Sequence, residues 1–409
     1  MRIAALSGWT REQKHVVAAS FLGWALDAFD FFLLVFVLKD IAQDFNTKIT
    51  DVTFAIFLTL AMRPVGAFLF GRAADRWGRR PTLMVDVLLY SIIEFASGFS
   101  PNLTILLVLR ALYGVAMGGE WGVGASLTME SIPPHARGFV SGLLQSGYPA
   151  GCFLASIVYG LLFPIIGWRG MFMVGVIPAL VVLYIRRSVP ESPSWTPTRA
   201  QSNTLTILKS HWRLGIYAIV LMTAFNFFSH GTQDLYPTFL QVEHGLAPRD
   251  VGLIAVVYNT GAILGGILFG SLSERFGRRR VIVAAALLSL PVLPLWAFST
   301  NPVWLAVGAF LMQVTVQGAW GVIPAHLNEL SPDEVRGTFP GFVYQLGNLI
   351  ASVNATLQAG IATRYGGNYG IALALVAGTV AVMIAVLTAL GVEAKGVAFG
   401  QGATERATP

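Results

Sequence analysis

Long apolar runs, separated by short polar connections, follow one another along almost the whole chain. A helix needs roughly 20 apolar residues to cross the hydrocarbon core of a bilayer. In hydrocarbon a segment has to pair its own backbone groups, which favours helices over irregular chain. We therefore expect an all-α membrane protein with twelve transmembrane helices. The twelve predicted spans are residues 15–38, 52–71, 81–99, 103–127, 138–163, 168–186, 214–240, 250–270, 281–298, 302–325, 338–363 and 368–391.

Composition excludes a soluble globular protein. Of 409 residues, 55% are hydrophobic and only 12% are charged, whereas a soluble domain carries about 25% charged residues. The net charge of +6 does not indicate a nucleic-acid partner, because the positive residues lie in the connections between spans. Cys152 is the single cysteine, so no intramolecular disulfide is possible.

The distribution of lysine and arginine predicts the orientation. Most of them fall at the two chain ends and in the connections on the same side as those ends. The positive-inside rule then predicts that both termini are cytoplasmic in a multi-pass protein of the cell (inner) membrane. The first apolar run contains Asp27 and Asp30 and lacks a clear cleavage site, so we expect no cleavable signal peptide.

The two halves of the chain repeat one another. The segment from Gly71 to Arg80 returns from Gly270 to Arg279, at an offset of 199 residues. A polar connection rich in Pro, Ser and Thr separates the halves, which predicts a linker. We expect a pseudo-symmetric six-helix bundle in each half. The predicted parts are an N-terminal bundle at 1–188, a cytoplasmic linker at 189–210, and a C-terminal bundle with a short cytoplasmic tail at 211–409. A parallel repeat of six spans is typical of transporters, with the substrate site between the halves near mid-membrane.

The repeated segment has the pattern G-x-x-x-D-R-x-G-R-R, with Glu274 in place of the aspartate in the second copy. This pattern resembles the most specific motif of the major facilitator superfamily, and the resemblance covers nearly the whole chain. It implies the major facilitator fold, in which the motif latches the two halves in one access state. The residues that this resemblance and the repeat assign to gating are Gly71, Asp75, Arg76, Arg79, Glu130, Arg137, Gly270, Glu274, Arg275, Arg278, Glu329 and Arg336.

A polar stretch interrupts the apolar run 214–240. It contains Asn226, Ser229, His230, Thr232, Gln233, Asp234 and Thr238. At 3.6 residues per turn, Asn226, His230, Gln233 and Asp234 fall near one face. Pro237 is expected to break or bend the helix near its outer end. The order of these polar residues resembles the helix-7 signature of the fungal lactate/pyruvate–proton symporters of the Jen family, which group with bacterial sialic-acid–proton symporters. The resemblance implies a proton-coupled symporter of a small monocarboxylate such as lactate or pyruvate. The alternative is a proton symporter of sialic acid or another larger organic acid.

Acidic residues inside the spans are candidates for proton coupling. Asp27 and Asp30 are spaced i, i+3 and share one helix face. Two nearby carboxylates in a low dielectric cannot both ionise cheaply, which suits a proton carrier. The alternative is a structural ion pair with Arg63. The further charged groups assigned to proton coupling are Asp234, Glu94, Arg110 and Glu120.

The predicted substrate site is built around Arg63, which lies about 12 Å into its helix. A guanidinium at that depth needs an anion and matches a carboxylate in two-pronged geometry. We therefore hypothesise that it binds the substrate anion, although a structural ion pair stays open. Uncharged polar groups suit the hydroxyl or carbonyl group of such an acid, although they also serve as interhelical hydrogen bonds. The other predicted substrate residues are Gln145, Tyr148, Asn226, His230, Gln345 and Asn348.

Other function classes fit less well. No HExxH, GxSxG or CxxC pattern occurs, so we expect no enzyme activity, metal site or cofactor. A sensor usually adds a soluble domain, for which no connection is long enough. The duplicated gating motif argues against a channel, because alternating access needs two locked states. We expect a monomer whose partners are a small carboxylate, the proton and the lipid bilayer.

Overall fold

The computed structural model describes residues 8–196 and 203–399, and all regular structure within them is helical. The all-α prediction is therefore confirmed. The α-helices are α1 (Arg11–Asp44), α2 (Ile49–Trp77), α3 (Arg79–Ser97), α4 (Leu103–Ser131), α5 (Arg137–Gln145), α6 (Gly147–Val174), α7 (Ala179–Ser188), α8 (Thr204–Ser210), α9 (Trp212–Gln233), α10 (Tyr236–Val242), α11 (Pro248–Phe276), α12 (Arg278–Leu288), α13 (Leu293–Phe298), α14 (Pro302–Leu330), α15 (Phe339–Ala351), α16 (Asn354–Arg364) and α17 (Tyr369–Leu390).

Every predicted span is occupied by helix, but several are interrupted. Span 138–163 breaks between α5 and α6, and span 338–363 breaks between α15 and α16. Span 281–298 carries a 3-10 turn at Leu290–Val292, where Pro291 removes a backbone donor. Span 214–240 ends as α9 and restarts as α10 with Pro237 in its first turn, as the proline predicted.

In the described chain, nine helical segments are long and apolar enough to cross a membrane. Two predicted spans, 81–99 and 338–363, lie outside these nine, and 168–186 lies outside them from residue 175 on. The first is α3, which carries acidic and basic residues along its length. Spans 338–363 and 168–186 are divided by non-helical residues, at 352–353 and at 175–178 respectively.

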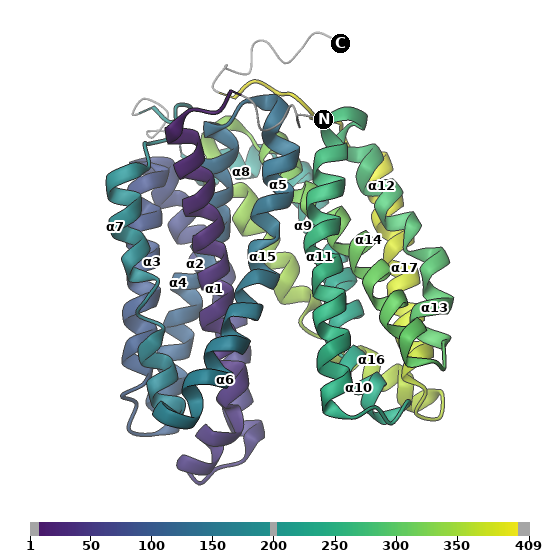
Figure 1. Ribbon diagram of the computed structural model, residues 1–409. Helices are drawn as coiled ribbons and strands as arrows, with labels where there is room; N and C mark the ends of the chain where they lie inside the picture. Colours follow the sequence, from purple (N-terminus) through teal and green to yellow (C-terminus); the bar gives the residue numbers. More distant parts are fainter. Residues whose placement is uncertain (1–7, 197–202, 400–409) are drawn as a thin grey trace.

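The helices form two groups that meet at one end of the molecule (Figure 1). Helices α1 to α7 make one group and α9 to α17 the other, and α5 and α15 lie between them. The described chain starts and finishes at this same end, where Trp9 and Phe399 pack on one cluster. The predicted linker contains a helix, α8, that the sequence did not indicate. Residues 197–202 of the linker lie outside the described residues.

A glycine makes the sharp corner after the long second helix of each half. Gly78 between α2 and α3 has φ 107°, and Gly277 between α11 and α12 has φ 95°. A side chain at such a φ is strained, so glycine is the residue that permits the turn. These two glycines belong to the repeated motif, which explains why the motif keeps a glycine there.

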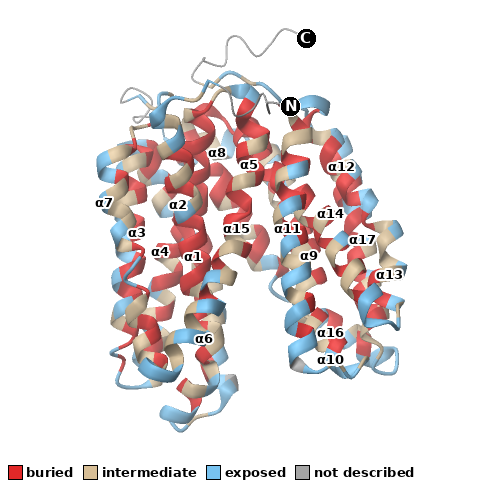
Figure 2. Cartoon of the chain, in the orientation of Figure 1, coloured by how far each residue is buried: buried red, intermediate tan, exposed pale blue. Residues whose placement is uncertain are grey.

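Close packing of α4 on α2 positions the polar interior of the first half. A Cβ on Gly114 would lie 2.2 Å from the carbonyl oxygen of Thr59, and a Cβ on Gly118 would lie 2.1 Å from that of Arg63. Small residues four apart let two helix backbones approach in this way. Buried residues concentrate along these central helices and at the end where the two groups meet (Figure 2).

Candidate functional site

A buried ion pair in the first bundle joins a predicted substrate-binding residue, Arg63, to a predicted proton-coupling residue, Asp27. Arg63 of α2 donates through Nη2 to Oδ2 of Asp27 in α1 at 3.2 Å, and both side chains are buried. Neither Nε of Arg63 nor Oδ1 of Asp27 has a hydrogen-bond partner within the described residues. Each partner of the pair therefore keeps one unused bonding position in a low-dielectric interior.

The second intramembrane arginine has a different partner. Arg110 lies 2.6 Å from Glu94 and donates to the hydroxyl of Ser97 at 2.7 Å. Its guanidinium also lies over the ring of Tyr113, 4.3 Å from the centroid. Arg110 is fully buried, and its contacts to Glu94, Ser97 and Tyr113 all lie within the first bundle.

Three further carboxylic acids are completely buried nearby. Asp30 in α1, Asp86 in α3 and Glu120 in α4 accept no hydrogen bond within the described residues. Asp86 was not among the predicted residues, although an acid in the middle of an apolar run was a signal that pointed to it. The interior of the first bundle thus holds five acids and two arginines, and no comparable group of buried acids is described in the membrane interior of the second half.

His230 connects α9 to α15. Its Nδ1 lies 3.2 Å from Asp234 one turn further along α9, and its Nε2 lies 3.1 Å from Oδ1 of Asn348 in α15. Both His230 and Asp234 keep about a third of their side chains exposed, at 33% and 39%. The pair is therefore reachable from the outside of the protein, unlike the buried acids of the first half.

The polar stretch of α9 forms hydrogen bonds with more than one neighbouring helix. Gln233 bonds to Gln313 of α14 at 2.8 Å, and Gln317 of α14 bonds to Ser229 at 3.1 Å. Asn226 donates to a carbonyl of its own helix at 2.8 Å. Gln233 and Ser229 therefore bond to α14, whereas His230 bonds to α15, so the stretch contacts two neighbouring helices.

Aromatic side chains surround the predicted amides. Gln145 accepts a hydrogen bond from the indole of Trp121 at 3.3 Å, and the ring of Trp121 lies 4.6 Å from that of Tyr344. Tyr148 lies 5.5 Å from Trp24. Gln345 is buried, and neither of its amide atoms has a partner within the described residues. Neither Trp121 nor Tyr344 was among the predicted site residues.

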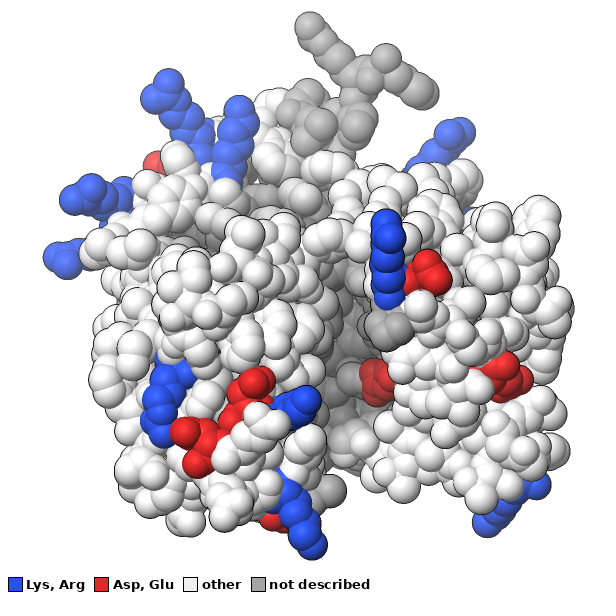
Figure 3. Space-filling view, turned by 60° about the horizontal axis from the view of Figure 1, so that its bottom comes forward, with Lys and Arg blue, Asp and Glu red and all other residues white. Residues whose placement is uncertain are grey.

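A hollow separates the two halves on the face opposite the chain termini (Figure 3). Its rim carries few charged side chains in that view. Arg63 lies within electrostatic range of His230 and Tyr148, which come from the second and first halves. The arrangement offers one guanidinium, a partner acid and uncharged polar groups from both halves, a set suited to holding a small anion.

A family model described as Major Facilitator Superfamily matches residues 20–247 and 235–406. The chain belongs to the major facilitator superfamily. It is a multi-pass membrane transporter and not an enzyme.

Relatives of this superfamily member are similar along most of its length. The sialic acid transporter NanX of Escherichia coli (strain K12) is 29% identical over 94% of this chain and 95% of the relative. A carboxylic acid transporter protein homolog of Saccharomyces cerevisiae is 28% identical over 89% of this chain and 64% of the relative. Among solved structures, the proton:xylose symporter XylE is similar in fold, with a TM-score of 0.79 at 18% identity, over 95% of this chain and 98% of that one.

The superfamily motif closes one end of the transporter. Asp75 at the end of α2 accepts from the backbone N–H groups of Gly337 at 2.7 Å and Thr338 at 3.1 Å, just before α15 begins. Glu274 at the end of α11 accepts from the backbone N–H of Gly138 in the first turn of α5. An acid is favourable at a helix N-terminus, and both contacts join one half to the other.

Arginine–glutamate pairs also occur at equivalent positions in the two halves. Arg79 holds Glu130 in two-pronged geometry at 3.1 and 3.2 Å, and Arg278 holds Glu329 at 2.9 and 3.0 Å. Two other arginines cross between the halves. Arg137 lies 3.7 Å from Glu329. Arg336 lies 3.6 Å from Glu130.

Glycines allow the halves to touch at this end. A Cβ on Gly71 would lie 2.5 Å from Cα of Thr338, and a Cβ on Gly270 would lie 2.5 Å from the carbonyl oxygen of Gly138. Any side chain at either position would force the halves apart.

Two motif arginines, Arg76 and Arg275, are exposed. Each lies beside the aromatic residue that follows it, 5.8 Å from Trp77 and 5.3 Å from Phe276. Neither side chain forms a hydrogen bond or salt bridge with the opposite half within the described residues, so their part in the latch stays a prediction.

The C-terminal tail adds a contact that the sequence did not indicate. Arg137 donates to the carbonyl oxygen of Val397 at 2.8 Å. The ring of Phe399 lies 3.6 Å from the guanidinium carbon of Arg137 and 3.9 Å from that of Arg336. One aromatic ring thus covers an arginine from each half.

Replacing Phe399 with alanine is expected to open this end more often. The change removes two cation–π contacts, each worth about 0.5–1 kcal/mol at exposed sites. The measurement is the distance between spin labels at Glu12 and Arg213, exposed positions on opposite halves, in a Cys152→Ser background. We expect a larger long-distance population in Phe399→Ala. Val392→Ala, an exposed tail position, serves as the control, and an equal shift in both variants contradicts the prediction.

Proposed function

We propose that this transporter is a proton-coupled symporter of a small monocarboxylate such as lactate or pyruvate, working by alternating access. The observation that carries the proposal is the buried Arg63–Asp27 pair at 3.2 Å, in which both partners keep an unused bonding position. A pair of this kind can exchange one anion for another. The proposal places the protein in the inner membrane as a monomer, with both termini and the linker cytoplasmic and the halves divided at 189–210.

Coupling follows from competition for Arg63. While Asp27 is ionised it occupies the guanidinium, and a second carboxylate brings an excess negative charge into the low-dielectric interior. A proton on Asp27 removes that competition, and the substrate carboxylate then takes its place in two-pronged geometry. Proton and substrate therefore bind together, and the neutral, loaded site permits the halves to move.

The other buried acids form a store for the proton in this scheme. Asp30, Glu94 and Glu120 lie close enough to Asp27 to interact with it electrostatically, and Arg110 pairs with Glu94. Asp234 beside His230 supplies an exposed entry from the hollow. The two arginines neutralise only two of the five buried acids, which favours protons on the rest.

The remaining site residues hold the uncharged part of the substrate. Gln345 has an unsatisfied amide, and an unsatisfied buried polar group is costly unless a ligand pairs with it. Asn348, Gln145, Tyr148 and Asn226 lie on α15, α5, α6 and α9, and we assign them to the wall of the same site. A hydroxyl or keto group next to a carboxylate matches this set.

The gate supports the alternating-access part of the proposal. The end with the described termini is closed by Asp75, Glu274 and the symmetric arginine–glutamate pairs, whereas the opposite face is hollowed. This is the arrangement expected of a transporter open to the outside. The inward-open state requires the Asp75 and Glu274 contacts to break.

A second candidate substrate is sialic acid or another larger acid, favoured by the similarity to NanX over 94% of the chain. Uptake of labelled lactate into vesicles, competed by pyruvate, acetate and sialic acid, separates the two. The proposal expects pyruvate to compete and sialic acid to have little effect. Competition by sialic acid alone would contradict the monocarboxylate assignment and favour a symporter of a larger organic acid.

Replacing His230 with glutamine is expected to raise the KM for lactate about five- to tenfold and to change the maximal rate less. The reason is that the imidazole contacts to Asn348 and Asp234 are lost from the wall of the site, a cost of roughly 1–1.5 kcal/mol. The initial rate of uptake against lactate concentration measures both constants. His211→Gln, an exposed histidine before α9, is the control, and an unchanged KM in His230→Gln contradicts the placement.

A further inference from the structure

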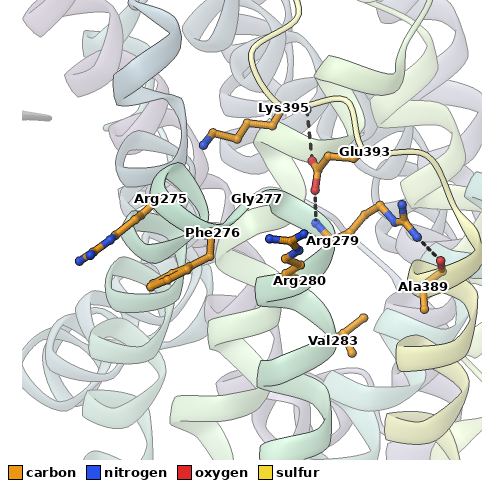
Figure 4. Close-up of a pocket in the computed structure, with 9 residues that line it drawn as sticks. All are labelled: Arg275, Phe276, Gly277, Arg279, Arg280, Val283, Ala389, Glu393 and Lys395. Carbon is orange, nitrogen blue, oxygen red and sulfur yellow. Dashed lines mark hydrogen bonds between the residues drawn. The ribbon is translucent and has the colours of Figure 1, made fainter. Parts of the chain in front are cut away.

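A second charged cavity lies far from the central site, at the end of the molecule that carries the termini. It has a volume of about 610 Å³ and lies where α11, α12, α17 and the C-terminal tail come together (Figure 4). Its charged lining residues are Arg275, Arg279, Arg280, Glu393 and Lys395. The proposed transport cycle uses none of the five at the central site.

The single acid of this cavity is already engaged. The carboxylate of Glu393 accepts from the backbone N–H groups of Arg278 at 3.2 Å, Arg279 at 3.0 Å and Lys395 at 3.2 Å. It thereby caps the N-terminus of α12 rather than pairing with a side-chain cation. Within the described ranges, none of the four lining cations forms a salt bridge.

Three of the four cations are free to meet a ligand. Arg279 donates to the carbonyl oxygens of Thr388 at 2.9 Å and of Ala389, which fixes it against α17. Arg275, Arg280 and Lys395 are exposed and line the cavity, with Arg275 at its edge and extending away from Arg280 (Figure 4). Like charges held together in this way repel one another, so an anion bound among them is favoured.

The wall that points toward the membrane is apolar. Val283 of α12 lines the cavity, and Leu287 one turn further along α12 is 42% exposed. On the neighbouring α17, Val386 is 51% exposed and Leu390 is 80% exposed. Exposed apolar side chains on membrane-spanning helices face hydrocarbon, so the cavity opens at the boundary between acyl chains and water.

We propose that this cavity binds the headgroup of an anionic phospholipid. The phosphate lies among Arg275, Arg280 and Lys395, and the acyl chains follow the apolar surface of α12 and α17. Basic pockets between transmembrane helices suit anionic headgroups for this reason. The apolar path distinguishes a lipid from a free phosphate, which would gain nothing from it.

The test compares two lipids with the same acyl chains. Purified full-length protein in detergent is titrated with dioleoylphosphatidylglycerol or dioleoylphosphatidylcholine, and bound lipids are counted by native mass spectrometry. We expect wild type to hold one phosphatidylglycerol tightly and phosphatidylcholine weakly. The triple variant Arg275→Gln, Arg280→Gln, Lys395→Gln is expected to lose affinity for phosphatidylglycerol on the order of 100-fold, and Arg280→Gln alone about fivefold.

A matched pair elsewhere provides the control. Arg213 lies 5.5 Å from the ring of Trp212, much as Arg275 lies beside Phe276, but it does not line the cavity. Arg213→Gln is expected to leave lipid binding unchanged. Equal retention of phosphatidylglycerol by wild type and the triple variant overturns the proposal. So does an equal loss in Arg213→Gln, or displacement of the lipid by inorganic phosphate at comparable concentration.

Discussion

Vesicles containing Asp27→Asn are expected to lose lactate accumulation driven by a pH gradient while retaining exchange of lactate. In wild type, ionised Asp27 competes for Arg63, so a proton has to enter with each substrate anion. Asparagine never competes, and the anion then moves without a proton. For a one-to-one symport, a gradient of one pH unit sustains about a tenfold accumulation. We expect that ratio to fall to about one in the variant, measured with labelled lactate at equilibrium.

The proposed competition between Asp27 and lactate for Arg63 also predicts that lactate binding depends on pH. In wild type the apparent affinity for lactate is expected to fall by up to about tenfold per pH unit once Asp27 ionises, because the ionised acid reclaims Arg63. In Asp27→Asn the affinity is expected to be independent of pH. Asp44→Asn is the control, since Asp44 forms an exposed pair with Arg169 at 3.0 Å. Full accumulation in Asp27→Asn would remove this acid from the coupling step.

Replacing Arg63 with lysine is expected to lower kcat/KM for lactate by at least about 30-fold, since breaking a buried charge pair costs about 2 kcal/mol or more. Lysine keeps the charge but loses the planar fork that holds two carboxylates in turn. Its ammonium is also strongly hydrated, so burial costs more. The measurement is the initial rate of proton-driven uptake over a range of lactate concentrations.

The surface pair again supplies the matched control. Arg169→Lys changes an arginine whose side chain is 38% exposed, and exposed ion pairs contribute about 0–1 kcal/mol. We expect its kcat/KM to stay within a few-fold of wild type. A combined Asp27→Asn, Arg63→Lys variant tests whether the two residues act as one unit. If their effects simply add, the pair does not exchange partners as proposed.

The sequence predicted the fold and its internal symmetry because both depend on local rules. Apolar length determines the spans, and a motif that appears twice at one offset indicates two similar bundles. The sequence also placed the gate acids, because Asp75 and Glu274 sit in that motif. It could not assign the partners of Arg63 and Arg110, because several acids occur at similar depth. Which acid faces which arginine depends on how α1, α3 and α4 are rotated against α2.

Other contacts that the sequence did not predict also depend on how distant segments pack together. The helical spacing places Gln233 near the face of His230, but it does not show that the Gln233 amide bonds to Gln313 of α14. Asp86 could have been assigned from the sequence, because it is an acid within an apolar run, as Glu94 is. Phe399 contacts Arg137 and Arg336 only after more than sixty residues of intervening chain fold back, and no local pattern records such a contact.

Proton movement during substrate entry tests the central claim most directly. Vesicles that contain the wild-type protein and an internal pH-sensitive dye receive external lactate without any imposed pH gradient. Proton–carboxylate symport predicts that the vesicle interior acidifies as lactate enters, and that Asp27→Asn shows lactate exchange without acidification. Lactate entry into wild-type vesicles with no change in internal pH would contradict the account.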